Sequence, residues 1–221
     1  MSLFSLLFPP RCIFCRRVLD ADHTGVCPAC QKRIFLSGSQ PRKAKGAFYR
    51  CVYSALWYEG DVRACLHRYK FGGKSSYALP LAQILAHILP GDQTFDLISF
   101  VPTNPTHVRK RGFHHTALLA EELSRRTGLP CTELLKKTRN TKPMYRLHPA
   151  QRRANILGAI APAAPDHTVA GKRILLVDDL LTTGSTLSEC ARVLLQQGAA
   201  GVWGITVAES KKISKKQQGR Y

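Results

Sequence analysis

Residues 173–186, RILLVDDLLTTGST, constrain the fold of this chain more than any other stretch. A run of apolar residues leads directly into two adjacent carboxylates, and hydroxyl side chains and a glycine follow. Apolar residues then recur with helical spacing at Leu187, Cys190, Ala191 and Leu194, which predicts a helix with one buried face. The stretch therefore predicts a buried strand, a polar loop and a helix, the succession from which parallel α/β sheets are built.

The surrounding sequence extends this alternation of strands and helices. Apolar runs at residues 96–102 and 201–209, and an aromatic and branched stretch at 49–59, have the composition of strands. Helical patterns begin at Asp61 and cover residues 77–89, 113–127 and 184–197. Continuous apolar strands between helices require a sheet that is covered on both sides. We therefore expect an α/β fold with a parallel sheet and helices on both faces.

Asp178 and Asp179 mark the expected binding site. Ligands of such sheets bind beyond the carboxyl ends of the strands, which is where the two acids fall. The next residues form a loop that feeds a helix, and they are Thr182, Thr183, Gly184, Ser185 and Thr186. Backbone N–H groups at a helix start, with hydroxyls beside them, suit a phosphate. The pattern predicts a ligand with hydroxyls or a metal ion at one end and a phosphate at the other.

Four of the eight cysteines form two Cys-x2-Cys pairs, Cys12 with Cys15 and Cys27 with Cys30. Two such turns supply the four thiolates of a tetrahedral zinc site, and a site filled by four cysteines is structural because no coordination position stays open. The alternative, two disulfides, fits poorly with a sequence that shows no secretory signal. The other four cysteines stand in apolar surroundings and are interpreted as small buried hydrophobes.

The chain is strongly basic, with 33 Lys and Arg against 14 Asp and Glu and a formal net charge of +19. This excess indicates either good solubility or an anionic partner such as phosphate, nucleic acid or a membrane surface. Residues 134–165 contain no acidic residue but many basic ones, and these are Lys136, Lys137, Arg139, Lys142, Arg146, Arg152 and Arg153. The basic tail, residues 210–221, lacks apolar periodicity and is expected to be disordered.

No apolar run approaches the roughly 18 residues of a membrane span. The apolar start MSLFSLLFPP lacks an early basic residue and runs straight into two prolines, so we interpret it as a packing segment rather than a signal peptide.

The segment ILLVDDLLTTGST is similar to the signature of type I phosphoribosyltransferases. In that family two acids hold the ribose hydroxyls of phosphoribosyl pyrophosphate, and a T-T-G-x-T loop holds its 5-phosphate. The resemblance implies these roles for Asp178 and Asp179 and for residues 182–186, with Mg²⁺ on the pyrophosphate. Some purine-salvage relatives carry a carboxylate where this chain has Thr182. His114 and His115 then become the candidates for a general base, although a histidine pair at a helix start is more often a packing feature.

Other segments resemble the ComF (GntX-like, competence-associated) family. VPTNPTHVRKRGFHHTALLAEEL is similar to its P-x-x-x-x-R-x-x-R-G-F region, with two histidines where Asn-Gln is usual. WYEGDVRACLHRYKFGGK resembles its Y-x-G-x(n)-K-F-x-G element, and Arg152 with Asn155 resembles its R-x-x-N element. With the double Cys-x2-Cys pattern, the resemblance covers residues 12–209. It implies that the loop holding Arg109, Arg111 and Gly112 faces the pyrophosphate.

The combined expectation is a type I phosphoribosyltransferase-like α/β domain preceded by a zinc ribbon. We place the zinc-ribbon module at residues 1–46, with a linker at 40–46, the main domain at 47–209 and the basic tail at 210–221. Residues 47–92 would form the hood, the segment that selects the base in relatives, together with the first helices. Trp57, Tyr58 and Tyr69 are the candidates in it for stacking on a base, although aromatics on an apolar strand are more often core.

Two functions stay open at this point. The ComF resemblance implies a cytoplasmic protein that handles imported single-stranded DNA during natural transformation, binds phosphoribosyl pyrophosphate with Mg²⁺, and works beside a helicase-like import motor. The intact acid and phosphate loop equally allows an active Mg²⁺-dependent phosphoribosyltransferase acting on a nucleobase or amine acceptor. A scaffold with an inactive cleft is disfavoured because the loop is whole. The sequence identifies no acceptor, no general base and no oligomeric state.

Overall fold

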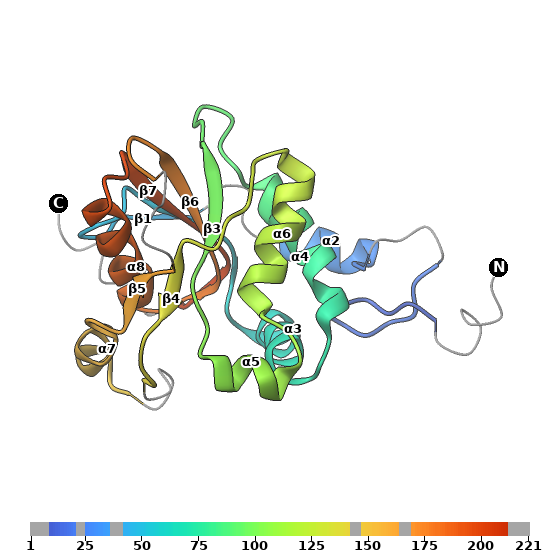
Figure 1. Cartoon of the computed structure of the whole chain (residues 1–221). Coiled ribbons are helices and arrows are strands. Elements are labelled where there is room, and N and C mark those ends of the chain that lie inside the picture. Colours follow the sequence, from blue (N-terminus) through green and yellow to red (C-terminus); the bar gives the residue numbers. More distant parts are fainter. Residues whose placement is uncertain (1–8, 21–24, 36–41, 142–146, 164–168, 212–221) are drawn as a thin grey trace.

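The computed structural model of the 221-residue chain describes residues 9–20, 25–35, 42–141, 147–163 and 169–211 (Figure 1). Most of the apolar N-terminal start and of the basic tail lies outside these ranges, so the expectations for both stay predictions. No helix in the described ranges is long and apolar enough to cross a membrane.

The centre of the molecule is a five-stranded sheet with the order β1-β2-β7-β6-β3. Its strands are β1 (Arg42–Ala44), β2 (Val52–Trp57), β3 (Leu97–Phe100), β6 (Arg173–Leu181) and β7 (Gly201–Glu209). All neighbours pair in parallel except β1 and β2, which are antiparallel. The segment expected as a linker therefore contributes an edge strand, because pairing along β2 outweighs the weak strand propensity of three polar or small residues.

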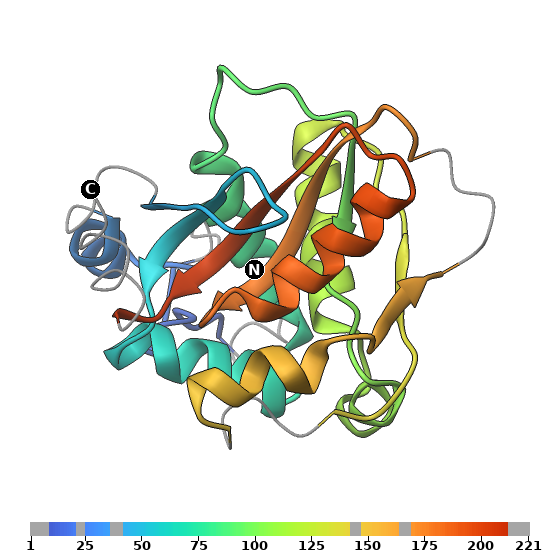
Figure 2. The same ribbon diagram turned by 90° about the vertical axis from the view of Figure 1, so that its left-hand side faces the viewer.

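Helices cover both faces of this sheet, as the apolar strands require (Figures 1 and 2). One face carries α3 (Gly60–Phe71), α4 (Ala78–His87) and α6 (His115–Thr127), with a short 3-10 turn at Ser75–Tyr77 before α4. The other carries α8 (Ser185–Gln196). Each face has its own apolar core, so every central strand is buried from both sides. The predicted fold class is confirmed in this respect.

Shorter elements border the carboxyl edge of the sheet. α5 (Pro105–Arg111) follows β3, and α7 (Pro149–Ile156) precedes β5 (Ile160–Pro162), which pairs with β4 (Leu135–Lys137) as a separate antiparallel ribbon. In Figures 1 and 2 the helices α3, α5 and α7 lie at the same end of the molecule. This end is where β2, β6 and β7 finish, and it is the edge at which parallel sheets bind ligands.

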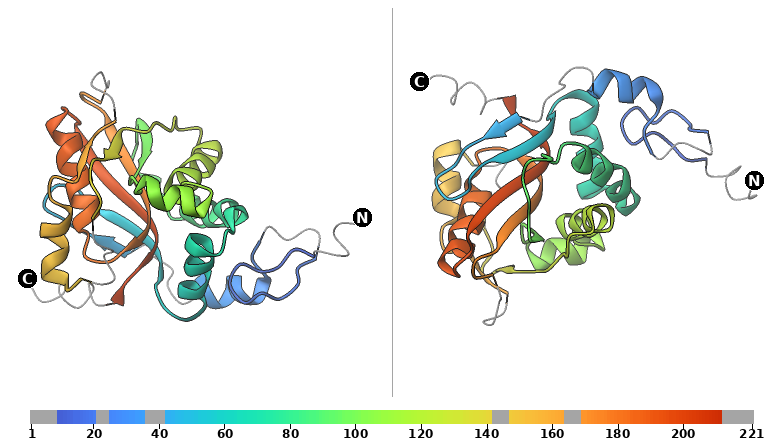
Figure 3. Two further views of the ribbon diagram at one scale, coloured as in Figure 1. Left: turned by 60° about the horizontal axis from the view of Figure 1, so that its bottom comes forward. Right: turned by 90° about the horizontal axis from the view of Figure 1, so that it is seen from above.

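The N-terminal module lies beside α3 and α4 at one end of the molecule (Figure 3). Ile13, Phe14 and the module's buried cysteines belong to the same apolar core as these helices. Arg68 of α3 donates hydrogen bonds to the carbonyl oxygens of Ile13 at 2.6 Å and Phe14 at 3.0 Å. The short helix α2 (Pro28–Phe35) reaches α3 through an ion pair between Arg33 and Asp61. The module is therefore packed onto α3 rather than tethered to it.

Candidate ligand cleft and metal centre

The two adjacent acids of β6 lie on opposite faces of the sheet, because side chains alternate along a strand. The strand runs through both acids as far as Leu181. Asp178 pairs in register with Thr206 of β7 and falls on the α8 side, and Asp179 falls on the side of α3 and α6. Neighbours in sequence therefore have separate environments.

Asp178 is half-buried on the face of the sheet that carries α8. Its Oδ1 accepts the backbone N–H of Asp179 at 2.9 Å. Burial, and then the negative charge of Asp179, raise the pKa of Asp178 above its ordinary value. A cation beside Asp178 would relieve both effects, so this carboxylate fits a metal ion or a hydroxyl donor.

Asp179 is buried and ion-paired. Its Oδ2 lies 2.6 Å from Nζ of Lys70, which comes from the last turn of α3, and its Oδ1 lies 3.8 Å from Nε2 of His115 at the start of α6. Burial alone would raise the pKa of Asp179, but Lys70 and His115 outweigh it and hold that pKa well below the usual range. The aspartates likewise raise the pKa of Lys70 against the effect of burial. The pair is charged on both sides and joins α3 to β6.

His115 extends this contact to the loop between β3 and α6. Nη1 of Arg111 donates a hydrogen bond to Nδ1 of His115, so the neutral imidazole carries its proton on Nε2, which faces Asp179. Burial lowers the pKa of His115 and keeps the ring neutral near pH 7. Tyr69 donates a hydrogen bond to the carbonyl oxygen of His115 at 2.6 Å. Arg111, His115, Asp179 and Lys70 thus form one continuous polar chain.

Of the predicted pyrophosphate-loop residues, Arg111 is the one that joins this polar chain, through its hydrogen bond to His115. It ends α5, and Gly112 follows in the left-handed conformation at φ 84°. The buried Nε of Arg111 makes no hydrogen bond to the described residues, which leaves a cationic donor available for an anion. Arg109 is exposed on the same short helix. The loop fits the predicted role, which stays a prediction.

His114 has a structural role in this fold. It is the N-cap of α6: its Nδ1 lies 3.2 Å from the backbone N–H of Ala117, and its Nε2 accepts the backbone N–H of Thr103 at 3.2 Å. Burial lowers the pKa of His114 to about 4. His114 is therefore committed to backbone contacts, in agreement with the packing interpretation of the histidine pair.

The expected phosphate loop forms the turn between β6 and α8. Gly184 is the N-cap of α8 and has φ 72°, a left-handed conformation that side chains disfavour. A Cβ there would lie 2.5 Å from the hydroxyl of Tyr49, which packs over the turn. Thr183 and Ser185 face each other with hydroxyls 2.9 Å apart, while Thr182 and Thr186 are half-buried. The turn therefore presents hydroxyl groups at the start of a helix. Tyr49 packs against this turn, a contact that the sequence did not predict.

The acid-free basic stretch borders the same edge of the sheet. Lys136, Arg139 and Arg153 are exposed. Arg139 donates to the carbonyl oxygens of Asn155 and Leu157 at the end of α7, and Asn140 accepts a hydrogen bond from Asn104 at the start of α5. Residues 142–146 lie outside the described ranges. In the described part of this stretch, the contact between Asn140 and Asn104 places the basic residues before α7 next to α5.

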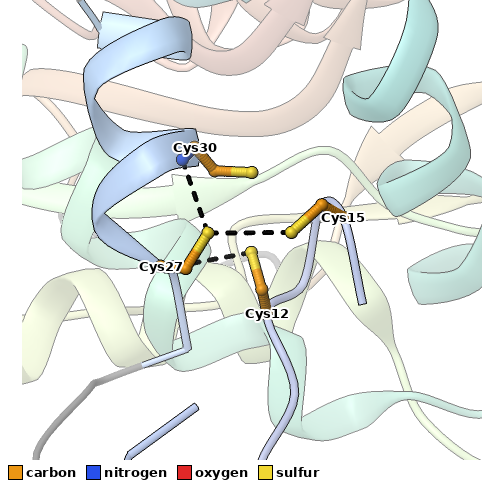
Figure 4. Close-up of side chains that lie close together, drawn as sticks. All are labelled: Cys12, Cys15, Cys27 and Cys30. Carbon is orange, nitrogen blue, oxygen red and sulfur yellow. Dashed lines mark hydrogen bonds between the residues drawn. The ribbon is translucent and has the colours of Figure 1, made fainter. Parts of the chain in front are cut away.

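The four cysteines of the N-terminal module converge on one point (Figure 4). The sulfur atoms of Cys12, Cys15, Cys27 and Cys30 all lie within 4.8 Å of one another, and those of Cys15 and Cys27 are 3.6 Å apart. A zinc ion with Zn–S bonds of about 2.3 Å requires sulfur separations of about 3.8 Å. All eight cysteines of the chain are described, and none is in a disulfide. The geometry therefore fits a closed structural zinc site and disfavours the disulfide alternative.

The aromatic side chains considered for base stacking and the remaining cysteines differ in how deeply they are buried. Tyr69 is buried with its hydroxyl bonded to His115, so it belongs to the core and cannot stack on a base. Trp57 borders a cavity of about 310 Å³ between Arg33 of α2 and Asp61 of α3. Cys65 and Cys190 are fully buried, and burial raises the pKa of the Cys65 thiol to about 12. These two thiols are part of the core, as expected.

Comparison with known proteins follows the same division of the chain. A double zinc ribbon domain matches residues 3–42, and a phosphoribosyl transferase domain matches residues 76–219. The predicted boundary between residues 46 and 47 falls between the two matches and stays a prediction.

Named proteins and a solved structure are similar to large parts of this chain. DNA utilization protein YhgH of Escherichia coli O157:H7 is 31% identical over 222 residues, covering 89% of this chain and 96% of that protein. Competence protein F of Haemophilus influenzae is 28% identical over 223 residues, covering 90% and 97%. The solved adenine phosphoribosyltransferase of Thermoanaerobacter pseudethanolicus is 20% identical and matches 68% of this chain and 79% of its own with a TM-score of 0.44.

The family expected from the motifs is thereby confirmed, since the phosphoribosyl transferase match spans well over half of the chain and the full-length relatives are matched almost end to end. The chain belongs to the ComF family of competence-associated, phosphoribosyltransferase-like proteins with an N-terminal double zinc ribbon.

Proposed function

We propose that this protein binds phosphoribosyl pyrophosphate with Mg²⁺ at the carboxyl end of β6 and the start of α8, which we call the candidate cleft, and that it handles imported single-stranded DNA in the cytoplasm during natural transformation. The observation that carries the proposal is the turn after β6, where a half-buried carboxylate at Asp178 stands a few residues before the hydroxyl-lined helix start at Gly184. A phosphorylated sugar carries hydroxyls at one end and a phosphate at the other, and these two kinds of group suit its two ends.

Each end of the ligand has matching groups. The backbone N–H groups and hydroxyls of residues 182–186 would hold the 5-phosphate, and Asp178 would hold a ribose hydroxyl or Mg²⁺. Arg111 would contact the pyrophosphate, because it ends α5 in the predicted pyrophosphate loop and its Nε makes no hydrogen bond to the described residues. When bound, Mg²⁺ offsets the charge of the pyrophosphate and orients the sugar hydroxyls. A ribose role for Asp179 stays a prediction, because its carboxylate is paired with Lys70.

Two observations support the handling of single-stranded DNA: the positive charge of the chain and the names of its relatives. The net charge of +19 is accompanied by exposed basic side chains on α5, on α7 and between β4 and α7. Lys and Arg that neutralise phosphates give binding that weakens steeply with salt. The matched relatives carry the names competence protein and DNA utilization protein. We include a helicase-like import motor as the proposed protein partner.

The Gly184→Ala variant tests the phosphate end of the cleft. A Cβ at this position has an unfavourable φ and lies 2.5 Å from the Tyr49 hydroxyl, so the turn must shift. We expect calorimetric affinity for Mg²⁺–phosphoribosyl pyrophosphate to fall by about tenfold or more, which is about 1.4 kcal/mol. Gly91→Ala is the control, because its φ is not positive and no atom lies within 4 Å of its Cβ. Equal affinity in both variants would contradict the assignment of this turn.

An active phosphoribosyltransferase is the alternative, and the cavity beside Trp57 is the observation in its favour. Its volume of about 310 Å³ is at the small end of the range for ligand pockets. It lies at the carboxyl end of β2, on the edge where the acids of β6 are found. An acceptor screen for pyrophosphate release separates the two functions: release that depends on one nucleobase or amine supports the enzyme, and its absence with intact ligand binding supports a regulatory cleft.

A further inference from the structure

Phe71 is the most exposed of the large apolar side chains in the described ranges, with 62% of its surface accessible. It is the last residue of α3. Removing a phenylalanine ring from water contributes favourable free energy. A ring that stays exposed in the folded chain therefore suggests a surface that is covered when a partner binds.

Cationic and aromatic groups surround this ring. The guanidinium carbon of Arg111 lies 5.5 Å from the ring centroid, and the ring of His67 lies 5.0 Å away at an angle of 48°. The two flanking groups come from different helices, α5 and α3, which lie at the same end of the molecule (Figure 1). Three further basic side chains near these residues in sequence are exposed: Lys74 follows α3, and Arg109 and Lys110 precede Arg111 on α5. An exposed ring among cations has the composition of a surface that binds single-stranded nucleic acid.

The ring also stands next to the polar chain of the cleft. Lys70, its neighbour in sequence, pairs with Asp179 at 2.6 Å, and Arg111 donates to His115. Phe71 therefore lies beside the polar chain that runs from Lys70 through Asp179 and His115 to Arg111. A strand end held at this ring would have its sugar and phosphate close to these residues.

We propose that Phe71 is a stacking platform for an unpaired base of single-stranded DNA, with the adjacent phosphates on Arg109, Lys110 and Lys74. This inference rests on the proposed handling of single-stranded DNA. Single strands fit because their bases have free faces, whereas the bases of a duplex are already stacked on each other. Cations on both flanks fit a polyanion and disfavour an apolar protein segment as the occupant.

The test compares Phe71→Ala, Phe71→Trp and Leu195→Ala in the zinc-loaded full chain. Leu195 is an exposed apolar residue of α8, on the opposite face of the sheet. A fluorescent oligothymidylate and an abasic oligonucleotide of the same length are titrated over a series of salt concentrations. We expect Phe71→Ala to weaken oligothymidylate binding by about tenfold and to leave the abasic strand unaffected, because a stacked base contributes about 1–3 kcal/mol, or about five- to 150-fold. Leu195→Ala should bind as the native chain does.

Phe71→Trp supplies a direct readout, since indole stacks at least as well as phenyl. We expect this variant to bind oligothymidylate tightly and the fluorescence of the added tryptophan to be quenched. The quenching is measured as the difference in fluorescence change from the native chain, which has two tryptophans. Equal oligothymidylate affinity for Phe71→Ala and the native chain would overturn the platform while leaving DNA handling intact. No binding by any chain at low salt would instead overturn the DNA half of the proposed function. Quenching by free thymidine but not by the oligonucleotide would overturn DNA as the occupant.

Discussion

At the scale of single residues, the protonation of the two acids depends on which charged groups lie next to each of them. Asp178 and Asp179 are identical in chemistry and adjacent in sequence, yet one has a raised pKa and the other a lowered one. The difference comes from strand alternation, which turns Asp179 toward Lys70 and His115 and leaves Asp178 near the phosphate turn. Lys70 and His115 therefore pair with one of the two acids and leave the other without a cationic partner among these residues.

Removal of the Lys70 charge tests this division. In Lys70→Met the buried Asp179 loses its strongest partner, and we expect the free energy of unfolding at pH 7 to fall by about 2 to 3 kcal/mol, less than for a fully buried pair because Lys70 is 24% exposed. Chemical denaturation measures this change. The double variant Lys70→Met with Asp179→Asn should recover part of the loss, because no unpaired charge stays buried.

The pH dependence of that variant has a definite sign. In the native chain the lowered pKa of Asp179 contributes stability that is complete above the unfolded value of about 3.9 and is lost as the pH falls further. Without Lys70, burial raises this pKa, so the deficit is largest at neutral pH and shrinks as the pH falls. Protonation of His115, which faces Asp179 from α6, acts in the same direction. A deficit that grows on acidification would contradict this account.

At the scale of elements, α3 connects the metal centre to the cleft through three consecutive residues. Arg68 donates hydrogen bonds to two carbonyl oxygens of the first Cys-x2-Cys turn, and Tyr69 donates one to the carbonyl oxygen of His115 at the start of α6. Lys70 forms an ion pair with Asp179 of β6. A helix is stiff over one turn, so a displacement at Arg68 is transmitted to Lys70. The zinc ribbon therefore supports the position of a cleft residue as well as its own fold.

Zinc removal should therefore reach the cleft. Structural zinc supplies folding free energy to its module. After chelation we expect faster amide hydrogen exchange in residues 9–35 and in α3, and weaker binding of phosphoribosyl pyrophosphate. Arg68→Met should reproduce the loosening of α3 with zinc retained, and Arg63→Met, on the exposed side of the same helix, should not. Unchanged exchange in α3 after verified loss of the metal would refute the connection.

Elements whose signals are local were predictable from the sequence. The strands β6 and β7 and the helices α6 and α8 were expected nearly at their observed bounds, because apolar runs and helical periodicity arise within one segment. The strand β1 was missed, since a run of three residues forms a strand only by pairing with β2. Lys70 and Phe71 stood in the quoted K-F-x-G element, but no local pattern reveals that they contact Asp179 of β6 and Arg111 of α5.

At the scale of the whole molecule, two features meet at one end of the sheet. The cleft combines a carboxylate with a phosphate cradle, and the surface around it carries the positive charge of α5, α7 and the end of α3. The zinc ribbon is joined to this end by α3, because Arg68 contacts the ribbon and Lys70 contacts β6. We interpret the molecule as a sugar-phosphate site with a basic, aromatic rim, held in shape by a metal-bound module.

The measurement that tests this account most directly is calorimetric titration of phosphoribosyl pyrophosphate, with and without Mg²⁺, into the zinc-loaded native chain, Asp178→Asn and Glu133→Gln. Glu133 is an exposed carboxylate outside the cleft, and its variant makes the same chemical change. We expect Mg²⁺-dependent binding by the native chain and the control, and a loss of at least about tenfold in Asp178→Asn, or about 1.4 kcal/mol. Absence of binding by all three proteins, or equal binding by all three, would contradict the assignment of the cleft.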